Sequence, residues 1–242
     1  MKFFDYELTL EIENIDFLSN NSGHPVVVSC LNPHSFVKAE NDSVFKEALR
    51  HSDYLIPDGV GICMEVHRWA GKQIKKIAGD DFHLQVLDQL NRQGGKIFYL
   101  GSTEKVLSGI RDHIHREYPH LEVMTHSPSY CTQHSKEENA AIIAKIEAFA
   151  PNALMVGLGA PKQEKWIYQN LEQIHTPQVI GAIGGAFEFF AGTIKRAPKW
   201  AINMHAEWLF RFIKEPLRMW ERNVVFTPKF LRYVKKHHEN MV

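Results

Sequence analysis

The chain of 242 residues has three cysteines, no net charge and no long apolar segment. Cys30, Cys63 and Cys131 have neither metal-site spacing nor the spacing of a disulfide framework, and this low cysteine content is typical of a reducing cytoplasm. Because no uninterrupted apolar run is long enough to span a bilayer, the sequence predicts no transmembrane helix. The first residues, Met1 to Leu8, also lack the apolar core of a signal peptide.

Common metal and nucleophile motifs are missing as well. The 14 histidines include no His-Glu-x-x-His motif, and we find no Cys/His cluster. Asp80 and Asp81 are adjacent, so they do not form the Asp-x-Asp pair that binds a metal–nucleotide complex. No serine or cysteine has the context of a catalytic nucleophile. We therefore expect no metal site and no cofactor.

The zero net charge hides an uneven distribution. Residues 195–242 contain 11 Lys and Arg but four Glu and no Asp, a net charge of +7, and the rest of the chain carries −7. Such a basic segment either binds phosphates or is a solvated helical tail. Its aromatic residues Trp208 and Phe212 are interleaved with Arg211, Arg218 and Arg222. This pattern fits an interfacial membrane helix or a helix that packs onto the core.

Short apolar runs rich in β-branched residues alternate with segments of helical periodicity. Strands are predicted at 25–31, 54–57, 96–101, 122–125, 153–157 and 178–183. A loop at 32–35, with Ser35 as a candidate cap, leads into a helix that ends near residue 51, and further helices are predicted at 60–70, 80–92, 103–118, 136–149 and from 161 onward. The alternation predicts an α/β fold with a doubly wound, mainly parallel sheet and helices on both faces. After Pro198 the pattern predicts helices at 200–213 and 216–233 without a strand. We therefore divide the chain into a Rossmann-like domain at 1–194 and a helical appendage at 195–242.

Three loops follow predicted strands directly: Pro57-Asp58-Gly59, the stretch from Gly157 to Gln163, and Gly181 to Gly185. Carboxyl ends of parallel strands form one edge of the sheet, where ligands bind. In the second loop, glycines such as Gly159 permit close backbone approach, and the following helix offers free N–H groups to an anion. Gly184 and Gly185 form either another backbone cradle or a close packing contact. Together the loops predict one composite site for a phosphate-bearing small molecule.

Several polar residues near these loops have two interpretations each. Asp58 is placed to act as a general base, but an Asp-Gly pair is also a common turn, which local sequence alone favours. Asn32 follows the first strand, where it holds either a substrate hydroxyl or a helix N-terminus. Lys76 and Asp81 flank Gly79 at a predicted helix start, where Asp80 or Asp81 could act as a cap.

The motifs, taken in order, resemble those of the WecG/TagA/CpsF glycosyltransferases, glycosyltransferase family 26. The resemblance runs from about residue 26 to 233. The matching segments are Asn32-Pro33, Asp53 to Gly61, Gly79 to Asp81, Gly157 to Glu164, Gly184-Gly185 with Phe189 and Gly192, Lys195 to Pro198, and Glu207 to Arg211 with Glu215, Pro216 and Arg218.

The resemblance implies an inverting transfer of an N-acetylmannosamine-type sugar from a UDP-sugar to a polyprenyl-diphosphate-linked N-acetylglucosamine. The products are bacterial surface polysaccharides such as teichoic acid, common antigen or exopolysaccharide. The resemblance implies no metal, no nucleic-acid partner, and a peripheral location on the inner leaflet of the cytoplasmic membrane. Another UDP-hexose or UDP-N-acetylmannosaminuronic acid as donor stays open. The oligomeric state, including a homo-oligomer, stays open too.

The resemblance also assigns roles to particular residues. Asp58 matches the proposed general base, and Gln163 matches a substrate-binding glutamine. Arginines of the appendage are thought to bind the donor diphosphate. By motif these are Arg211 and Arg218, with Arg222 aligned less securely. The other candidate substrate-binding residues are Asn32, Lys76, Asp81, Gly159, Gly184, Gly185 and Arg196.

The chain departs from the family pattern at two positions. Cys30 stands where the family often has Thr, and Lys76 stands where it often has Arg, so a hydroxyl and a bidentate guanidinium are lost. Both changes bear on substrate preference, whereas the proposed base is retained. Two other functions compete with a transferase. A Rossmann-type oxidoreductase would need a third glycine where Lys162 stands. A non-catalytic module that docks on a membrane or a nucleotide would leave Asp58 and the glycine loops unused.

Overall fold

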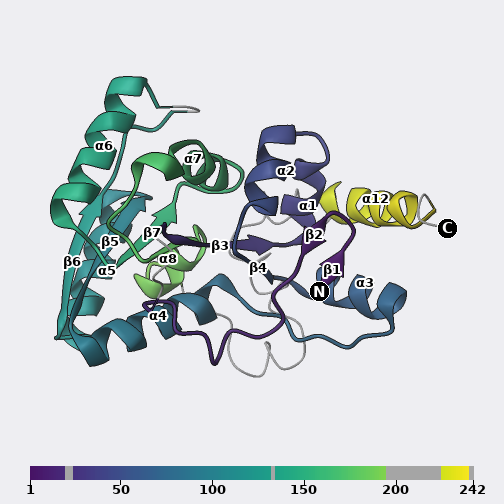
Figure 1. The fold of residues 1–242 in the computed structure, drawn as a ribbon, viewed down its shortest axis with the longest axis horizontal. Helices are drawn as coiled ribbons and strands as arrows, with labels where there is room; N and C mark the ends of the chain where they lie inside the picture. Colours follow the sequence, from purple (N-terminus) through teal and green to yellow (C-terminus); the bar gives the residue numbers. More distant parts are fainter. Residues whose placement is uncertain (20–23, 132–133, 195–224, 240–242) are drawn as a thin grey trace.

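A computed structural model describes residues 1–19, 24–131, 134–194 and 225–239. Its centre is a six-stranded parallel sheet with the strand order β4-β3-β8-β7-β5-β6 (Figure 1). The strands are β3 (Val26–Leu31), β4 (Tyr54–Pro57), β5 (Gly95–Gly101), β6 (Leu121–His126), β7 (Ala153–Gly157) and β8 (Val179–Ala182). All six were predicted from the alternation of apolar runs and turn residues.

Helices cover both faces of the sheet. Figure 1 shows α2 (Ser43–Arg50), α6 (Lys136–Phe149) and α7 (Lys162–Asn170) on one side, and α4 (Gly79–Gln93) and α8 (Ala186–Phe190) on the other. The remaining helical elements of this part are α1 (Pro33–Ala39), α3 (Val60–Ala70), α5 (Glu104–Glu117) and the short η1 (Leu171–Gln173). The predicted doubly wound α/β fold is confirmed.

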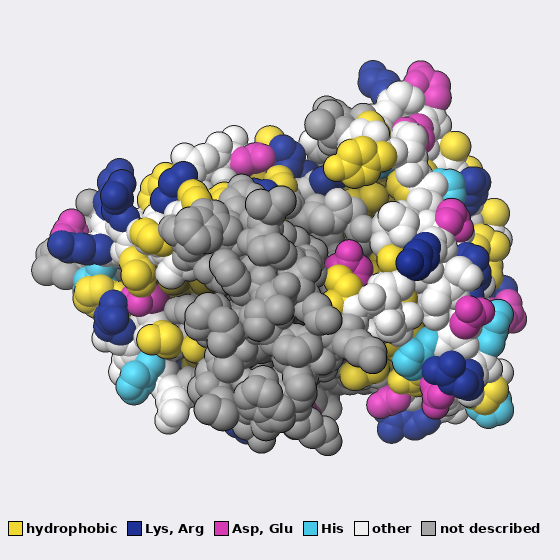
Figure 2. Space-filling model, turned by 180° about the vertical axis from the view of Figure 1, so that it is seen from behind, with side chains coloured by type: hydrophobic (Ala, Val, Ile, Leu, Met, Phe, Trp, Pro, Cys, Tyr) yellow, Lys and Arg dark blue, Asp and Glu magenta, His cyan; other side chains and the backbone are white. Residues whose placement is uncertain are grey.

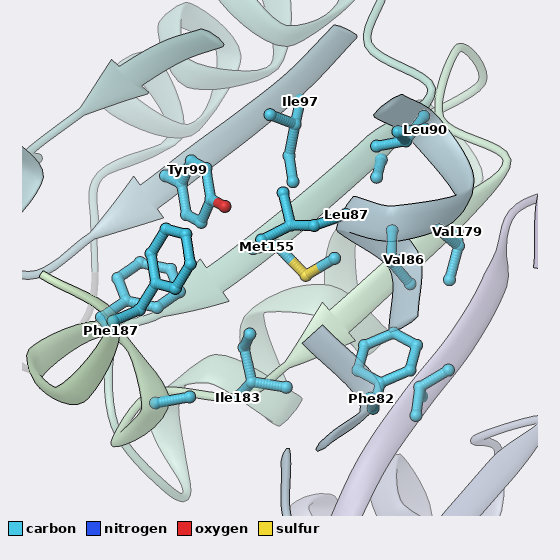
Figure 3. Packing of buried hydrophobic residues seen from close by; sticks show 14 of the residues in the cluster. Phe82, Val86, Leu87, Leu90, Ile97, Tyr99, Met155, Val179, Ile183 and Phe187 are labelled. Atoms are coloured by element: carbon cyan, nitrogen blue, oxygen red, sulfur yellow. The ribbon is translucent and has the colours of Figure 1, made fainter. Parts of the chain in front are cut away.

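Successive residues of a strand pack into two different hydrophobic clusters, one on each face of the sheet, because side chains alternate between the two faces. Val28, Tyr99 and Met155 pack with α4, α5 and α8, whereas their neighbours Val27 and Leu154 pack with α6 and α7. Figure 3 shows the first of these clusters, in which residues of α4 lie over the β5, β7 and β8 strands. Both faces of the sheet are therefore buried, as the nearly continuous apolar strands require.

The segment predicted as a loop at 32–35 followed by one helix to about residue 51 forms two helices, and the first of them already begins at Pro33. Asn32, not Ser35, caps α1: Oδ1 of Asn32 accepts from the backbone N–H of Ser35 over 3.0 Å, and Oγ of Ser35 accepts from the N–H of Asn32 over 2.8 Å. Asp42 then caps α2 by accepting from the N–H of Phe45. The Ser35 prediction was wrong because Pro33 suits the first position of a helix, so α1 begins there and its cap is the preceding residue, Asn32, three residues before Ser35.

The helix α12 (Thr227–Glu239) packs on α1 (Figure 1). Phe230 of α12 is buried with its ring 5.4 Å from that of Phe36, and Nε2 of His237 lies 2.8 Å from Oε2 of Glu40. The same cluster contains the hairpin of β1 (Lys2–Phe3) and β2 (Tyr6–Glu7), which the sequence did not predict. The predicted helix 216–233 is thus present in its described part and extends to Glu239.

The predicted domain boundary at 194/195 falls where a stretch outside the described residues begins, as does the predicted helix at 200–213. In the described parts of the chain, no helix is both long and apolar enough to cross a bilayer.

Candidate functional site

Asp58 lies at the carboxyl edge of the sheet, directly after β4. Its backbone N–H donates to the carbonyl of Leu31 at the end of β3 over 2.9 Å. The next residue, Gly59, has a φ of 118°, and a Cβ there would lie 3.7 Å from Cβ of Asn32. The glycine therefore allows the sharp turn that places the Pro-Asp-Gly loop against the loop after β3. Asp58 and Asn32, far apart in sequence, become neighbours.

Further carboxylates gather around Cys30 near the end of β3. Burial raises the pKa of the Cys30 thiol well above its usual value, and the negative charges of Asp58, Glu164 and Asp81 raise it further. The start of α4 is also close, because a Cβ on Gly79 would lie 3.2 Å from Sγ of Cys30. Cys30 of β3 therefore lies beside the start of α4 and within the electrostatic influence of Asp58 and of Glu164 in α7.

Lys76 lies in the same neighbourhood, in the exposed segment before α4. Burial raises the pKa of the Cys63 thiol; a backbone hydrogen bond and the positive charge of Lys76 lower it, and the charge of Asp58 raises it. Asp81 has the capping role that the sequence left open, since its Oδ2 accepts from the N–H of Ala78 over 2.9 Å. Its side chain is exposed at the first turn of α4.

The side chain of Gln163 connects the two glycine loops. Its Oε1 accepts from the backbone N–H of Gly159 over 3.1 Å and from that of Gly184 over 3.2 Å. Its Nε2 donates to Oε1 of Glu164 over 2.9 Å. Gln163 is buried, so in this structure the amide holds the loops after β7 and β8 at a fixed separation.

The glycines of these loops have two different environments. A Cβ would meet the Phe187 ring at 2.5 Å from Gly157, and Oε1 of Gln163 at 2.5 Å from Gly184, so both glycines are needed for packing. At Gly159, with a φ of 78°, and at Gly185, a Cβ would have no neighbour within 4 Å among the described residues. Within that part of the chain, the backbone at these two positions can therefore be approached by a ligand beside the N-terminus of α7.

Glu164 is the last residue of the motif from Gly157 to Glu164, and the sequence predicted no role for its side chain. It is 3% exposed, and its Oε2 has no hydrogen-bond partner among the described residues. Burial raises its pKa to about 7, although hydrogen bonds from Gln163 and its own backbone, and the charge of Lys38, act in the opposite direction. A buried carboxyl with a strongly raised pKa, next to a glycine-rich loop, is typical of a functional site.

A groove of about 600 Å³ runs between α1 and α12 and reaches the glycine loop at Pro161. Its lining residues are Val37, Lys38, Asn41, Asp42, Pro161, Phe226, Lys229, Arg232, Tyr233 and Lys236. Four of these are cations, and the single carboxylate, Asp42, pairs with Lys165 over 2.8 Å. Phe226 of the groove also contacts the first turn of α1, because the rings of His34 and Phe226 lie 4.4 Å apart. The groove is therefore suited to an anion.

Sequence reasoning identified the basic character of the last segment but not the residues Lys229, Arg232 and Lys236. Their spacing of three and four residues was a readable signal of one helical face. It also missed Cys131, His134 and Glu138, whose donor atoms lie within 4.8 Å of one another. The predicted site residues Arg196, Arg211, Arg218 and Arg222 lie outside the described residues.

Comparison with known proteins gives a consistent result. The model of the glycosyl transferase WecG/TagA/CpsF family matches residues 7–240. Two relatives are named N-acetylglucosaminyldiphosphoundecaprenol N-acetyl-beta-D-mannosaminyltransferase. The protein from Bacillus spizizenii is 30% identical over 98% of this chain and 89% of its own. The one from Bacillus subtilis is 31% identical over 88% of this chain and 80% of its own. A Staphylococcus aureus protein of the same name is 28% identical over 90% of this chain and 83% of its own.

Proposed function

Because the chain belongs to the WecG/TagA/CpsF family of glycosyltransferases, we propose that it transfers an N-acetylmannosamine-type sugar from a UDP-sugar to a polyprenyl-diphosphate-linked N-acetylglucosamine. The names of the relatives support this donor sugar and this acceptor. The observation that carries the proposal is the position of Asp58, which shares one sheet edge with the open backbone of the glycine loops.

In the proposed reaction, an acceptor hydroxyl attacks the anomeric carbon of the donor sugar while Asp58 takes its proton as general base. The bond between the anomeric carbon and the β-phosphate oxygen breaks, and UDP leaves with the electron pair. A single displacement of this kind inverts the anomeric centre. The location of Asp58 supports this role. Its carboxylate lies near Cys30, Cys63 and Lys76 at the carboxyl edge of the sheet, rather than in the hydrophobic core.

The leaving diphosphate needs positive charge or N–H donors in place of a metal ion. We propose that the backbone at Gly185 and the N-terminus of α7 supply the donors, and that Gly159, whose N–H donates to Gln163, lets the diphosphate approach the backbone closely. Gln163 supports this binding site because its side chain fixes the separation of the two glycine loops. Its proposed role in substrate binding is therefore exerted through the position of these loops. Arg196, Arg211, Arg218 and Arg222 are proposed to add the cationic side chains.

The basic groove is proposed to accept the diphosphate of the lipid-linked acceptor. Lys38, Lys229, Arg232 and Lys236 surround it, and its wall includes Pro161 of the glycine loop. This location would keep the enzyme on the inner leaflet of the cytoplasmic membrane as a peripheral protein, with residues 195–242 as the attached appendage. On the described part of the face in Figure 2, acidic and basic side chains are interspersed, which does not favour nucleic acid as a partner.

The test measures the UDP that full-length protein releases from a UDP-sugar, with a short-chain lipid-diphosphate-linked N-acetylglucosamine as the acceptor. UDP-N-acetylmannosamine is compared with UDP-N-acetylmannosaminuronic acid and with other UDP-hexoses. We expect the first donor to give the highest kcat/KM and a disaccharide product of inverted configuration. Preference for another donor would correct the sugar, and no transfer from any UDP-sugar would overturn the proposal.

A further inference from the structure

Cys131, His134 and Glu138 form a compact cluster of donor atoms away from Asp58. Sγ of Cys131 lies 3.2 Å from Nδ1 of His134, and this nitrogen lies 3.0 Å from Oε2 of Glu138. The cluster spans the loop after β6 and the first turn of α6. The predicted glycosyl transfer does not use any of the three residues.

These separations are close to those required by a small metal ion. Zinc binds thiolate sulfur at about 2.3 Å and imidazole nitrogen or carboxylate oxygen at about 2.0–2.2 Å, so tetrahedral ligand atoms lie about 3.3–3.6 Å apart. The sulfur–nitrogen and nitrogen–oxygen separations are a few tenths of an ångström shorter, and all the donor atoms lie within 4.8 Å of one another. A small outward rotation of the side chains therefore makes room for the ion. One soft sulfur, one imidazole and one carboxylate favour Zn²⁺ or Co²⁺ over Mg²⁺ or Ca²⁺, which prefer oxygen ligands.

The surroundings orient the donors toward one another. The hydroxyl and the backbone N–H of Ser129 both donate to Oε1 of Glu138, which leaves Oε2 to face His134. His134 is buried and faces the cluster with Nδ1, while its Nε2 has no partner among the described residues. Such outer contacts are typical of metal sites.

We propose that Cys131, His134 and Glu138 bind one Zn²⁺-type cation, with the fourth coordination position open to water. This site nevertheless touches the glycine loop through Lys162, the first residue of α7. Nζ of Lys162 donates to the carbonyl of Cys131 over 2.7 Å and lies 3.8 Å from its sulfur. Metal binding thus fixes the loop after β6 against the start of α7. The ammonium also opposes the cation electrostatically, which limits the affinity.

The test is titration of full-length, metal-free protein with Co²⁺, followed by competition with Zn²⁺. We expect one equivalent of Co²⁺ to give a thiolate-to-cobalt absorption band that Zn²⁺ abolishes, and Zn²⁺ to raise the Tm. Cys131→Ser should lose the band and the rise in Tm. Cys63→Ser, which removes a cysteine on α3, should keep both.

Ser129→Ala tests the orienting hydrogen bonds, and we expect it to weaken Zn²⁺ binding roughly 10–100-fold. Glu138→Gln keeps an oxygen that can accept from Ser129 but removes the charge, and it should weaken binding further. Circular dichroism checks that each variant is folded. A wild-type protein without the cobalt band, or a Cys131→Ser variant that binds Zn²⁺ as tightly as wild type, would overturn the proposal.

Discussion

Glu164 anchors the side-chain amide of Gln163. Nε2 of Gln163 donates to Oε1 of Glu164 over 2.9 Å, while the second carboxyl oxygen of Glu164 has no partner among the described residues. The carboxyl is therefore held on one side and desolvated on the other, so its pKa rises to about 7. Because the pKa of Glu164 is raised in the folded state, the stability of the protein depends on pH through this pair of residues, which lies between the loops after β7 and β8.

Glu164→Gln should change the pH dependence of stability. Between pH 4.5, the usual pKa of the group, and pH 7, folded wild type keeps a proton that the unfolded chain has lost. Its free energy of unfolding therefore falls as pH rises, by up to about 3 kcal/mol across this window. The variant should lack this fall. Chemical denaturation from pH 4.5 to 8 measures it, with the exposed Glu172→Gln as control. Parallel profiles for Glu164→Gln and wild type would contradict the raised pKa.

Gly184→Ala should destabilise the protein, whereas Gly185→Ala should not. A Cβ at Gly184 would lie 2.5 Å from Oε1 of Gln163 and would displace it, so the N–H groups of Gly159 and Gly184 would lose their acceptor. We expect a loss of about 1–3 kcal/mol in the free energy of unfolding. Gly185 has a φ of −67°, and no described residue lies within 4 Å of a Cβ at this position. Equal stabilities of the two variants in urea denaturation would show that the hydrogen bonds from Gly159 and Gly184 to Gln163 contribute little to stability.

Asp58→Asn should abolish most turnover because it keeps the shape of the side chain and removes the proton acceptor. General base catalysis typically contributes ~10²–10⁴-fold, so kcat for UDP release should fall within that range while donor affinity changes little. Asp112→Asn, on the exposed surface of α5, is the matched control. Near-normal kcat in Asp58→Asn would return Asp58 to the role of a turn residue.

Removing three cations from α12 should weaken membrane binding. Lys229, Arg232 and Lys236 are exposed and line the groove, and each cation near an anionic surface contributes about 1 kcal/mol. Changing all three to Gln should therefore lower partitioning to anionic vesicles on the order of 10²-fold at low salt.

The control for this experiment removes equal charge elsewhere, with Lys105, Arg116 and Lys136 changed to Gln on α5 and α6. Vesicle co-sedimentation compares the two proteins. Equal losses would mean that total charge, rather than the groove, determines docking.

Glycosyl transfer should persist in excess chelator, because the proposed leaving-group stabilisation uses backbone N–H groups and arginines. UDP release is measured with and without chelator. A complete loss that magnesium or manganese restores would reveal a catalytic metal. Repeating the assay in Cys131→Ser separates an effect through the proposed zinc site, since such an effect should be absent from that variant.

Local sequence determined the elements and their order. The apolar runs fixed all six strands of the sheet, and the turn residues after them marked the loops that carry Asp58, Gly159 and Gly184. Hydrophobic periodicity and turn chemistry act within a few residues, so one sequence suffices to read them. Prediction failed where two neighbouring residues suit the same role. Asn32 and Ser35 both have side chains that can cap the N-terminus of α1, and local sequence does not distinguish them.

Tertiary structure alone decided which distant residues meet. The pairing of Gln163 with the amide of Gly184 depends on β7 and β8 being neighbours. Burial of Glu164 and of Phe230 depends on helices that pack from other parts of the chain. A buried carboxyl has a raised pKa because the surrounding fold excludes water from it, and that property is not present in the motif itself. The motifs predicted the candidate site residues, and packing determined the environment of each described side chain among them.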